Sequence, residues 1–168
     1  TWLARALAPA PHVERLPDLD VRRVYPRLRW AVLESTFVGY ATYYLIRNNL
    51  SPVAKDIETA LKYSHEDIGD ILAVTAITYG LGKLVMGALS DRSNPRGFMP
   101  LGLILTAILN ITFGCVGSFW AHLFLWGLNG FVQGMGWPPC GRSIGHWFSS
   151  HERGTVFGQA VVYVEGAR

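Results

Sequence analysis

The sequence has 168 residues and a net charge of +3, and half of its residues are hydrophobic while only 16% are charged. Charged residues make up roughly a quarter of an ordinary soluble domain, so this composition predicts a membrane protein instead. Six of the fifteen Lys and Arg residues lie before residue 30, which leaves no basic face spread widely enough to bind nucleic acid.

Residues 1–29 are predicted to form a leader on the cytoplasmic side of the membrane. They contain four prolines, which interrupt helices, and too many charges for the apolar core of a signal peptide. The chain begins with Thr1 and stops soon after a new apolar run starts. We therefore expect a piece of a longer protein.

Four apolar segments follow the leader, and each has about the 20 residues that a helix needs to cross a bilayer. The predicted spans lie at about 30–52, 67–90, 97–119 and 121–147, and a fifth begins near residue 155. Ser64 followed by Asp67 predicts the start of the second helix, and Pro95 marks the start of the third. The predicted fold class is an all-α membrane protein, with residues 30–168 forming part of an N-terminal transmembrane domain.

The distribution of cations predicts the orientation of these spans. Because the linkers are short, neighbouring helices must be antiparallel, and cytoplasmic loops carry the excess of Lys and Arg. Ten such residues lie on the side of the leader, and only Lys55 and Lys62 lie in the acidic first linker on the other side. The N-terminus is therefore predicted to be cytoplasmic.

Glycines in the fourth span are spaced for close helix packing. Gly130 and Gly134 form a G-x-x-x-G pattern, which lets two helix backbones approach each other in a membrane. Glycine is also simply common in membrane helices. We expect the packing role.

Two cations within the predicted spans, Arg47 and Lys83, are the main functional signal. A charge inside the membrane costs at least ~2.5–3.5 kcal/mol on insertion scales, so it usually faces a cavity. Lys83 lies near the middle of its span, whereas Arg47 is close enough to the helix end to reach the outer interface with its side chain. Both readings of Arg47, interfacial and functional, stay open on this argument.

Tyrosines share the helix faces of these two cations. Tyr40, Tyr44 and Arg47 follow the i, i+4, i+7 spacing of one face, and Tyr79 and Lys83 follow the i, i+4 spacing of another. The second and third spans contain no acidic residue that could neutralise the cations. Guanidinium and ammonium groups without a carboxylate suit a phosphate or carboxylate ligand. The five residues therefore predict a binding site for an anionic substrate.

Two further segments can be interpreted in two ways. Asp91, Arg92 and Arg96 form either an ordinary basic loop or a gating loop between the second and third spans. The stretch from Gln133 to Arg142, which contains Trp137, Pro138 and Pro139, interrupts helical hydrogen bonding. It is either a bend or gate beside a cavity, or only the end of the fourth helix.

The sequence motifs give little support to an enzyme or a metal-binding protein. The sequence contains no phosphate-binding loop, zinc-protease motif or nucleophile elbow, so we do not expect an enzyme. Cys115 and Cys140 lie in apolar stretches without the spacing of a metal site. We expect neither a metal nor a cofactor.

The most distinctive stretches together resemble those of a known family. These are GYATYYLIRNNL, GALSDRSNPR, QGMGWPPCGR and HWFSSHERG, and the resemblance extends from about Arg29 to Gly154. They look like the organophosphate:phosphate antiporters of the major facilitator superfamily, which include glycerol-3-phosphate and hexose-phosphate transporters and a related membrane sensor.

The resemblance implies a role for each matching residue. It implies twelve helices in two halves with the substrate between them, of which this chain has the first four and the start of a fifth. Arg47 would bind the substrate phosphate, with Lys83, Tyr40 and Tyr44 beside it. Asp91 and Arg92 match the superfamily's gating loop, and Trp137 matches a tryptophan of the fourth helix.

Two positions depart from the family pattern. The residue after Arg47 is usually a second cation but here is Asn48, and the fifth helix usually carries a histidine where this chain reads GQAVVYVEGAR. The end of the chain after about Gly158 therefore either diverges or is out of register.

These residues lead to one functional hypothesis and two alternatives. We expect a transporter in the bacterial inner membrane that exchanges an organic phosphate ester for inorganic phosphate, as a monomer when full length, with its C-terminal half supplying the opposite side of the site. A membrane sensor that binds sugar phosphate without transporting it is the first alternative. An enzyme acting on lipid phosphates is the second, but no nucleophile or acid–base pair is found near Arg47.

Overall fold

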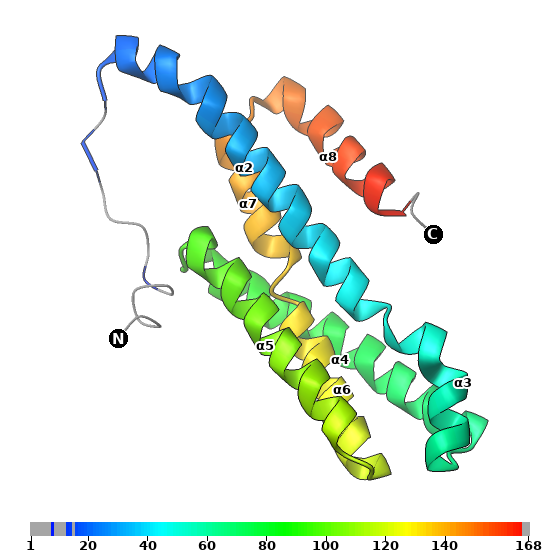
Figure 1. Cartoon of the computed structure of the whole chain (residues 1–168). Helices are drawn as coiled ribbons and strands as arrows, with labels where there is room; N and C mark the ends of the chain where they lie inside the picture. The colour runs from blue at the N-terminus through cyan, green and yellow to red at the C-terminus, as the bar shows by residue number, and fades with distance from the viewer. Residues whose placement is uncertain (1–7, 9–12, 15, 166–168) are drawn as a thin grey trace.

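The computed structural model describes residue 8, residues 13–14 and residues 16–165, with side chains up to residue 156 and at residue 158. The described part of the chain is all-helical, as predicted, and contains no strand. In chain order, the helices are α2 (Asp18–Arg47), α3 (Leu50–Leu61), α4 (His65–Asp91), α5 (Pro95–Cys115), α6 (Phe119–Gln133), α7 (Trp137–Trp147) and α8 (Ser150–Glu165), labelled as in Figure 1.

Helix boundaries follow from local chemistry. Ser64 caps α4, because its side chain accepts a hydrogen bond from the Asp67 backbone while the Asp67 carboxylate accepts one from the Ser64 backbone. Helix α5 begins at Pro95, with the Asn94 side chain accepting from the Arg96 backbone. The predicted starts of the second and third long helices are thus confirmed.

Two predicted spans differ from the observed helices in their bounds. Helix α2 begins at Asp18, so it includes residues 18–29 of the predicted leader, and it ends at Arg47 before the separate helix α3. The predicted span at 121–147 is two helices, α6 and α7, because Gly134–Gly136 and the two prolines after Trp137 break the helical ladder. Which parts of the helices lie within a membrane stays a prediction.

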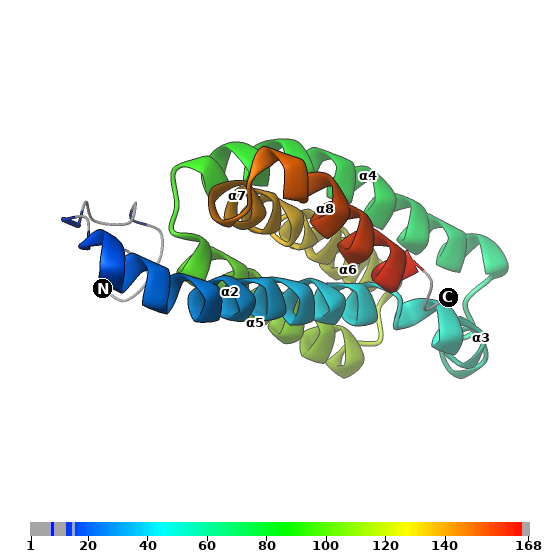
Figure 2. The same cartoon turned by 90° about the horizontal axis from the view of Figure 1, so that it is seen from above.

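Helices α6 and α7 occupy the centre of the bundle. Figure 2 shows them between α4 on one side and α2 with α5 on the other. Helix α6 packs most extensively against α4 and α5, and α7 packs against α2 and α4. One core cluster contains Leu50, Ile71, Phe113 and Trp126, and a second contains Phe98, Val132 and Met135.

Two helices of the described chain, α4 and α5, are long and apolar enough to cross a membrane. Only 11% of the most apolar window of α4 is buried inside the bundle, and 28% of that of α5. Their apolar side chains therefore face outward, as expected for helices whose surroundings are lipid rather than water. Neither α6 nor α7 alone is long enough to cross a membrane, because the helix is broken between them.

Candidate functional site

Arg47 is the last residue of α2 and is held by neutral partners. Its Nε donates a hydrogen bond to Gln133 Oε1 of α6 at 2.7 Å, and its guanidinium lies over the ring of Tyr79 at 4.0 Å and that of Tyr44 at 5.0 Å. Its Nη2 atom is buried without a hydrogen-bond partner. Among the side chains that the structure describes, no carboxylate forms an ion pair with Arg47.

Lys83 meets Arg47 through a shared aromatic ring. Its Nζ lies 4.5 Å from the centre of the Tyr79 ring, whose contact with Arg47 is described above. Cations are attracted to the negatively charged face of such a ring, so Tyr79 stabilises two positive charges close together. Lys83 is exposed, whereas Arg47 is half-buried. We call Arg47, Tyr44, Tyr79, Lys83 and Gln133 the Arg47 cluster.

Tyr40 of α2 and Trp137 of α7 extend the Arg47 cluster. The rings of Tyr40 and Tyr44 are 5.5 Å apart, and those of Tyr40 and Trp137 are 5.1 Å apart. The structure therefore brings all five residues of the predicted anion site, which lie on two helices, into one continuous group of contacts.

Close packing of α4 against α6 positions this group. A Cβ added to Gly134 would lie 2.5 Å from the backbone carbon of Gly82 and 2.8 Å from the backbone nitrogen of Lys83. One added to Gly130 would lie 2.6 Å from the backbone oxygen of Thr75. The predicted packing role of the G-x-x-x-G pattern is confirmed: it brings the backbones of Lys83 and Gln133 together.

Gln133 was not singled out in the sequence as a partner of Arg47. The two residues are 86 positions apart, and only the packing of α6 beside α2 reveals the contact. A signal was nevertheless present, because Asn129 and Gln133 are amides spaced i, i+4 on a largely apolar helix. Both are 1% exposed, and a buried amide needs hydrogen-bond partners.

Asp91, Arg92 and Arg96 lie at the junction of α4 and α5. Asp91 is twelve residues beyond Tyr79, the α4 residue that contacts Arg47, and all three side chains are exposed. This loop is attached to α7 by Arg142, whose Nη1 donates to the backbone oxygens of Ser90 and Ser93, both at 2.7 Å. This attachment was also missed. A gating role for the loop stays a prediction.

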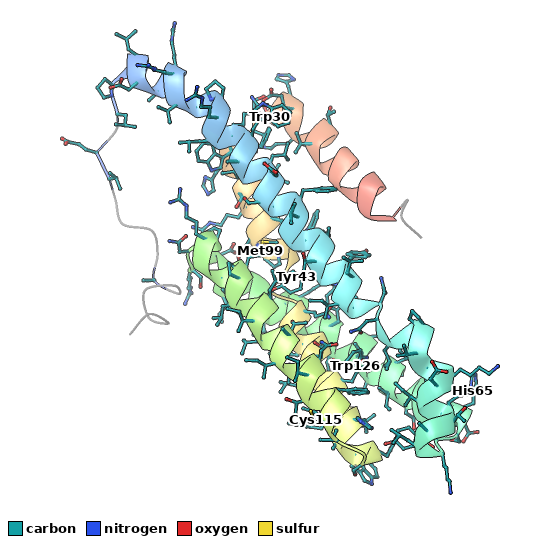
Figure 3. All side chains as sticks on the ribbon, in the orientation of Figure 1. Trp30, Tyr43, His65, Met99, Cys115 and Trp126 are labelled. Atoms are coloured by element: carbon teal, nitrogen blue, oxygen red, sulfur yellow. The ribbon has the colours of Figure 1, made fainter. Side chains whose placement is uncertain are left out.

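The break between α6 and α7 is also a contact point with α2. A Cβ added to Gly136 would lie 3.1 Å from the ring of Tyr43, so glycine gives this buried ring its space. The Tyr43 hydroxyl donates to the backbone oxygen of Met99 at 3.1 Å, and Figure 3 shows both residues where α2 passes α5. Pro138 and Pro139 lie in the first turn of α7. The structure shows a break here, and a gating role stays a prediction.

Lys83 is the exposed member of the Arg47 cluster, and Gln133 is its buried member. A pocket of about 470 Å³ lies elsewhere, between α3, α5 and α6, and its lining includes Asn49, Asp56, Asn110 and His122. We assign the anion chemistry to the Arg47 cluster rather than to this pocket, because the pocket lining contains Asp56 and no Lys or Arg, whereas the cluster contains both. Among the described residues, no group of three or more His, Cys, Asp or Glu side chains is placed to hold a metal.

Comparison with known proteins identifies the class. The model of the Major Facilitator Superfamily matches residues 36–162. The chain therefore belongs to this superfamily of membrane transporters. The resemblance of the sequence motifs predicted this membership, and the all-helical fold agrees with it.

Three relatives show which members of the superfamily this chain is similar to. The glycerol-3-phosphate transporter of Bacillus subtilis (strain 168) is 46% identical over 88% of the chain and 34% of the relative. The probable hexose phosphate transport protein of Chlamydia trachomatis is 39% identical over 88% of the chain and 32% of the relative. The membrane sensor protein UhpC of Escherichia coli (strain K12) is 41% identical over 89% of the chain and 34% of the relative.

The chain thus spans about a third of the length of these relatives. It is similar to proteins named for transport of phosphate esters and to one named as a sensor. None of the three is named as an enzyme.

Proposed function

We propose that this chain forms one side of the substrate site of a secondary transporter that exchanges an organic phosphate ester for inorganic phosphate. The similarity to glycerol-3-phosphate and hexose phosphate transporters supports the class of substrate. The exchange with inorganic phosphate is supported by the chemistry of the Arg47 cluster, because ester and free phosphate share the group that a guanidinium binds.

The observation that carries the proposal is the state of Arg47. Its partners are an amide and two aromatic rings, and none of the described carboxylates neutralises it. An unneutralised guanidinium in an apolar setting is costly, and an anionic ligand removes that cost. Gln133 occupies Nε and Nη2 is buried, so Nη1 is the nitrogen that remains for a phosphate group.

Lys83 would contribute a second charge to the same ligand. Its ammonium and the Arg47 guanidinium lie on one ring, so both lie within reach of one phosphate ester. Tyr40 and Tyr44 would orient the ester through their hydroxyls. Tyr79 holds the two cations together in the absence of ligand.

The proposed mechanism is alternating access in the inner membrane, with the N-terminus of the chain in the cytoplasm. A further set of helices, in the part of the polypeptide that the relatives have in addition, would form the opposite side of the site. Phosphate bound between the two sides would draw them together, and their rocking would expose the site to each compartment in turn. We expect the complete protein to act as a monomer.

The test is exchange of radiolabelled phosphate against a phosphate ester in proteoliposomes containing the complete polypeptide. We expect Arg47→Ala to abolish exchange, and Arg47→Lys to lose at least tenfold because the planar fork is lost. Arg22→Ala, which removes an exposed arginine from the same helix, is the matched control and should exchange normally. Wild-type exchange by Arg47→Ala would refute the proposal.

A sensor is the second candidate, since UhpC is 41% identical to this chain. A sensor would bind the phosphate ester but would not release internal phosphate in exchange. Saturable binding without exchange in the same vesicles would therefore favour the sensor over the transporter.

A further inference from the structure

Unpaired polar atoms gather behind Arg47, on its buried side. Within the described part of the chain, five buried side-chain nitrogen or oxygen atoms lack a hydrogen-bond partner. Four of them are Arg47 Nη2, Thr106 Oγ1, Asn129 Nδ2 and Gln133 Nε2, and the fifth belongs to Ser90 at the distant end of α4. Thr106 is fully buried. Such atoms are rare in folded proteins and each needs an explanation.

Contacts along the helices place these four atoms at one junction. Helix α2 runs alongside α5, with Tyr43 bound to Met99 and Asn49 bound to Asn110. Arg47, the last residue of α2, lies between Tyr43 and Asn49 in the chain, so it lies near the level of Thr106, which lies between Met99 and Asn110.

Helix α6 reaches the same level from the other direction. Asn110 contacts Asn129, and a Cβ added to Gly102 would lie 2.9 Å from Met135. Thr106 is one turn from both Asn110 and Gly102 and therefore faces the residues between Asn129 and Met135. The four residues that carry the unpaired atoms therefore lie at one level of the bundle, where α2, α5 and α6 pack together.

The directions of the amides are determined by their paired atoms. Gln133 presents its oxygen to Arg47 Nε, so its nitrogen is the unpaired atom. The nitrogen of Asn110 donates to the backbone oxygen of Thr106 at 2.8 Å and also approaches Asn129 Oδ1 at 3.4 Å, which leaves Asn129 Nδ2 unpaired. Rotating either amide by 180° would place two donors against each other.

We propose that this junction binds ordered water, and that at least two molecules occupy it. Three nitrogens need acceptors there, and one water molecule accepts only two hydrogen bonds. A second water accepts the third and donates to Thr106 Oγ1. Buried water of this kind typically makes about three hydrogen bonds to groups that lack other partners.

The pocket of about 470 Å³ is the source of this water. Asn49 and Asn110 line that pocket, and Asn110 also contacts Asn129 at the junction. A polar route therefore leads from the α3 end of the bundle to the back of Arg47. Asn129 and Thr106 become positioning residues, which hold the guanidinium through water while its other side faces the ligand; this role rests on the proposed function.

The sign of a change in thermal stability tests the proposal without any transport assay. Thr106→Val removes a hydroxyl with little change in volume, and Asn129→Leu removes an amide while adding volume. If water is bound, both variants of the complete protein lose hydrogen bonds and melt at a lower temperature than wild type. If the junction is dry, Thr106→Val removes an unsatisfied group and melts at the same or a higher temperature, which overturns the proposal. Asn129→Leu also loses the hydrogen bond from Asn110, so the sign is decided by Thr106→Val.

Thr112→Val is the matched control, because Thr112 lies on the same helix with its hydroxyl bound to the Ile108 backbone and its side chain exposed. Its melting temperature should stay close to that of wild type. In exchange assays, Thr106→Val and Asn129→Leu should raise the KM for phosphate by about two- to tenfold with little change in maximal rate. An unchanged KM in both, with Arg47→Ala inactive, would refute the positioning role while leaving the proposed function intact.

A structure of the complete protein at a resolution that shows water provides the direct test. Two density peaks within hydrogen-bond distance of Arg47 Nη2, Asn129 Nδ2 and Thr106 Oγ1 are expected. An empty junction would overturn the proposal. So would a single anomalous peak there after bromide soaking, because one anion would then accept from the unpaired nitrogens of Arg47, Asn129 and Gln133.

Discussion

Arg29 and Arg47 lie on the same helix, five helical turns apart, and each combines an aromatic ring with a side-chain hydrogen bond. Arg29 lies 4.3 Å from the centre of the Phe148 ring and forms an ion pair with Glu152 at 2.7 Å. Arg47 lies 4.0 Å from the centre of the Tyr79 ring and forms a hydrogen bond with Gln133, also at 2.7 Å. One guanidinium has a carboxylate partner and the other has an amide.

The difference separates a structural arginine from a binding arginine. At Arg29 the positive charge is already neutralised, and the contact attaches α2 to the start of α8, next to the hydrogen bond from the Tyr25 hydroxyl to the Trp147 backbone. At Arg47 the amide fixes the direction of the guanidinium without neutralising it. Only the second arrangement leaves the charge for a ligand.

Gln133→Glu should have the largest effect, because it gives Arg47 the type of partner that Arg29 has. The new carboxylate would neutralise Arg47 and repel a phosphate group. A hydrogen bond between charged groups is worth about 1.5–3 kcal/mol, so exchange should fall by roughly 10- to 100-fold. Radiolabelled phosphate exchange in proteoliposomes measures this.

Gln133→Leu is the control for Gln133→Glu, since it removes the hydrogen bond without adding charge. Its exchange should fall less than that of Gln133→Glu. Equal losses in both variants would show that charge is not what distinguishes the two arginines.

Gly134→Ala should affect the Arg47 cluster and leave the Arg29 contact in place. The added methyl group would meet the backbones of Gly82 and Lys83, which cannot move aside as a flexible side chain could. Overpacking of this kind costs about 1–3 kcal/mol, and the separation of α4 from α6 should also reduce exchange. Thermal melting of the complete protein in detergent measures the stability.

The matched control is Gly80→Ala, on α4, where an added Cβ has no atom within 4 Å. That variant should be as stable as wild type or slightly more so, because alanine favours a helix over glycine. If both glycine variants melt alike, close packing at Gly134 does not hold the Arg47 cluster together.

The sequence predicted the four residues of the Arg47 cluster that share helix faces on α2 and α4. It missed Gln133, which comes from a third helix, α6. Periodicity alone groups Tyr44 with Arg47 and Tyr79 with Lys83, because an i, i+4 spacing determines a face. It contains no information on which helix packs against which. Gln133 and Glu152 are 86 and 123 residues from their arginines, so both contacts depend on tertiary packing.

Helix ends that depend on local chemistry were more predictable than the length of α2. The capping residue Ser64 and the prolines at the starts of α5 and α7 act locally, so their effects are visible in the sequence. The extension of α2 back to Asp18, through Pro26, was not, because proline disfavours a helix interior in general. Residues 18–29 also contact α7 and α8 through Tyr25 and Arg29, and these distant contacts support the helix there.

Glu152→Gln should have the smallest effect, because the Arg29 pair lies at the surface. Hydrogen bonds from Arg29 and from Ser149 lower the pKa of the Glu152 carboxyl from its usual 4.5 to about 2. A carboxyl with a lowered pKa in the folded protein stabilises it fully above the unfolded pKa. This contribution is lost as the pH falls from about 4.5 to about 2.

The difference in melting temperature between wild type and Glu152→Gln should therefore be small and constant from pH 7 to pH 5, and should shrink towards zero as the pH approaches 2. High salt should reduce it at every pH, because both side chains are partly exposed, at 27% and 43%. Phosphate exchange at pH 7 should stay at the wild-type level. A large loss of exchange in Glu152→Gln would mean that Arg29 is not merely a structural contact, and that the carboxylate is not what separates it from Arg47.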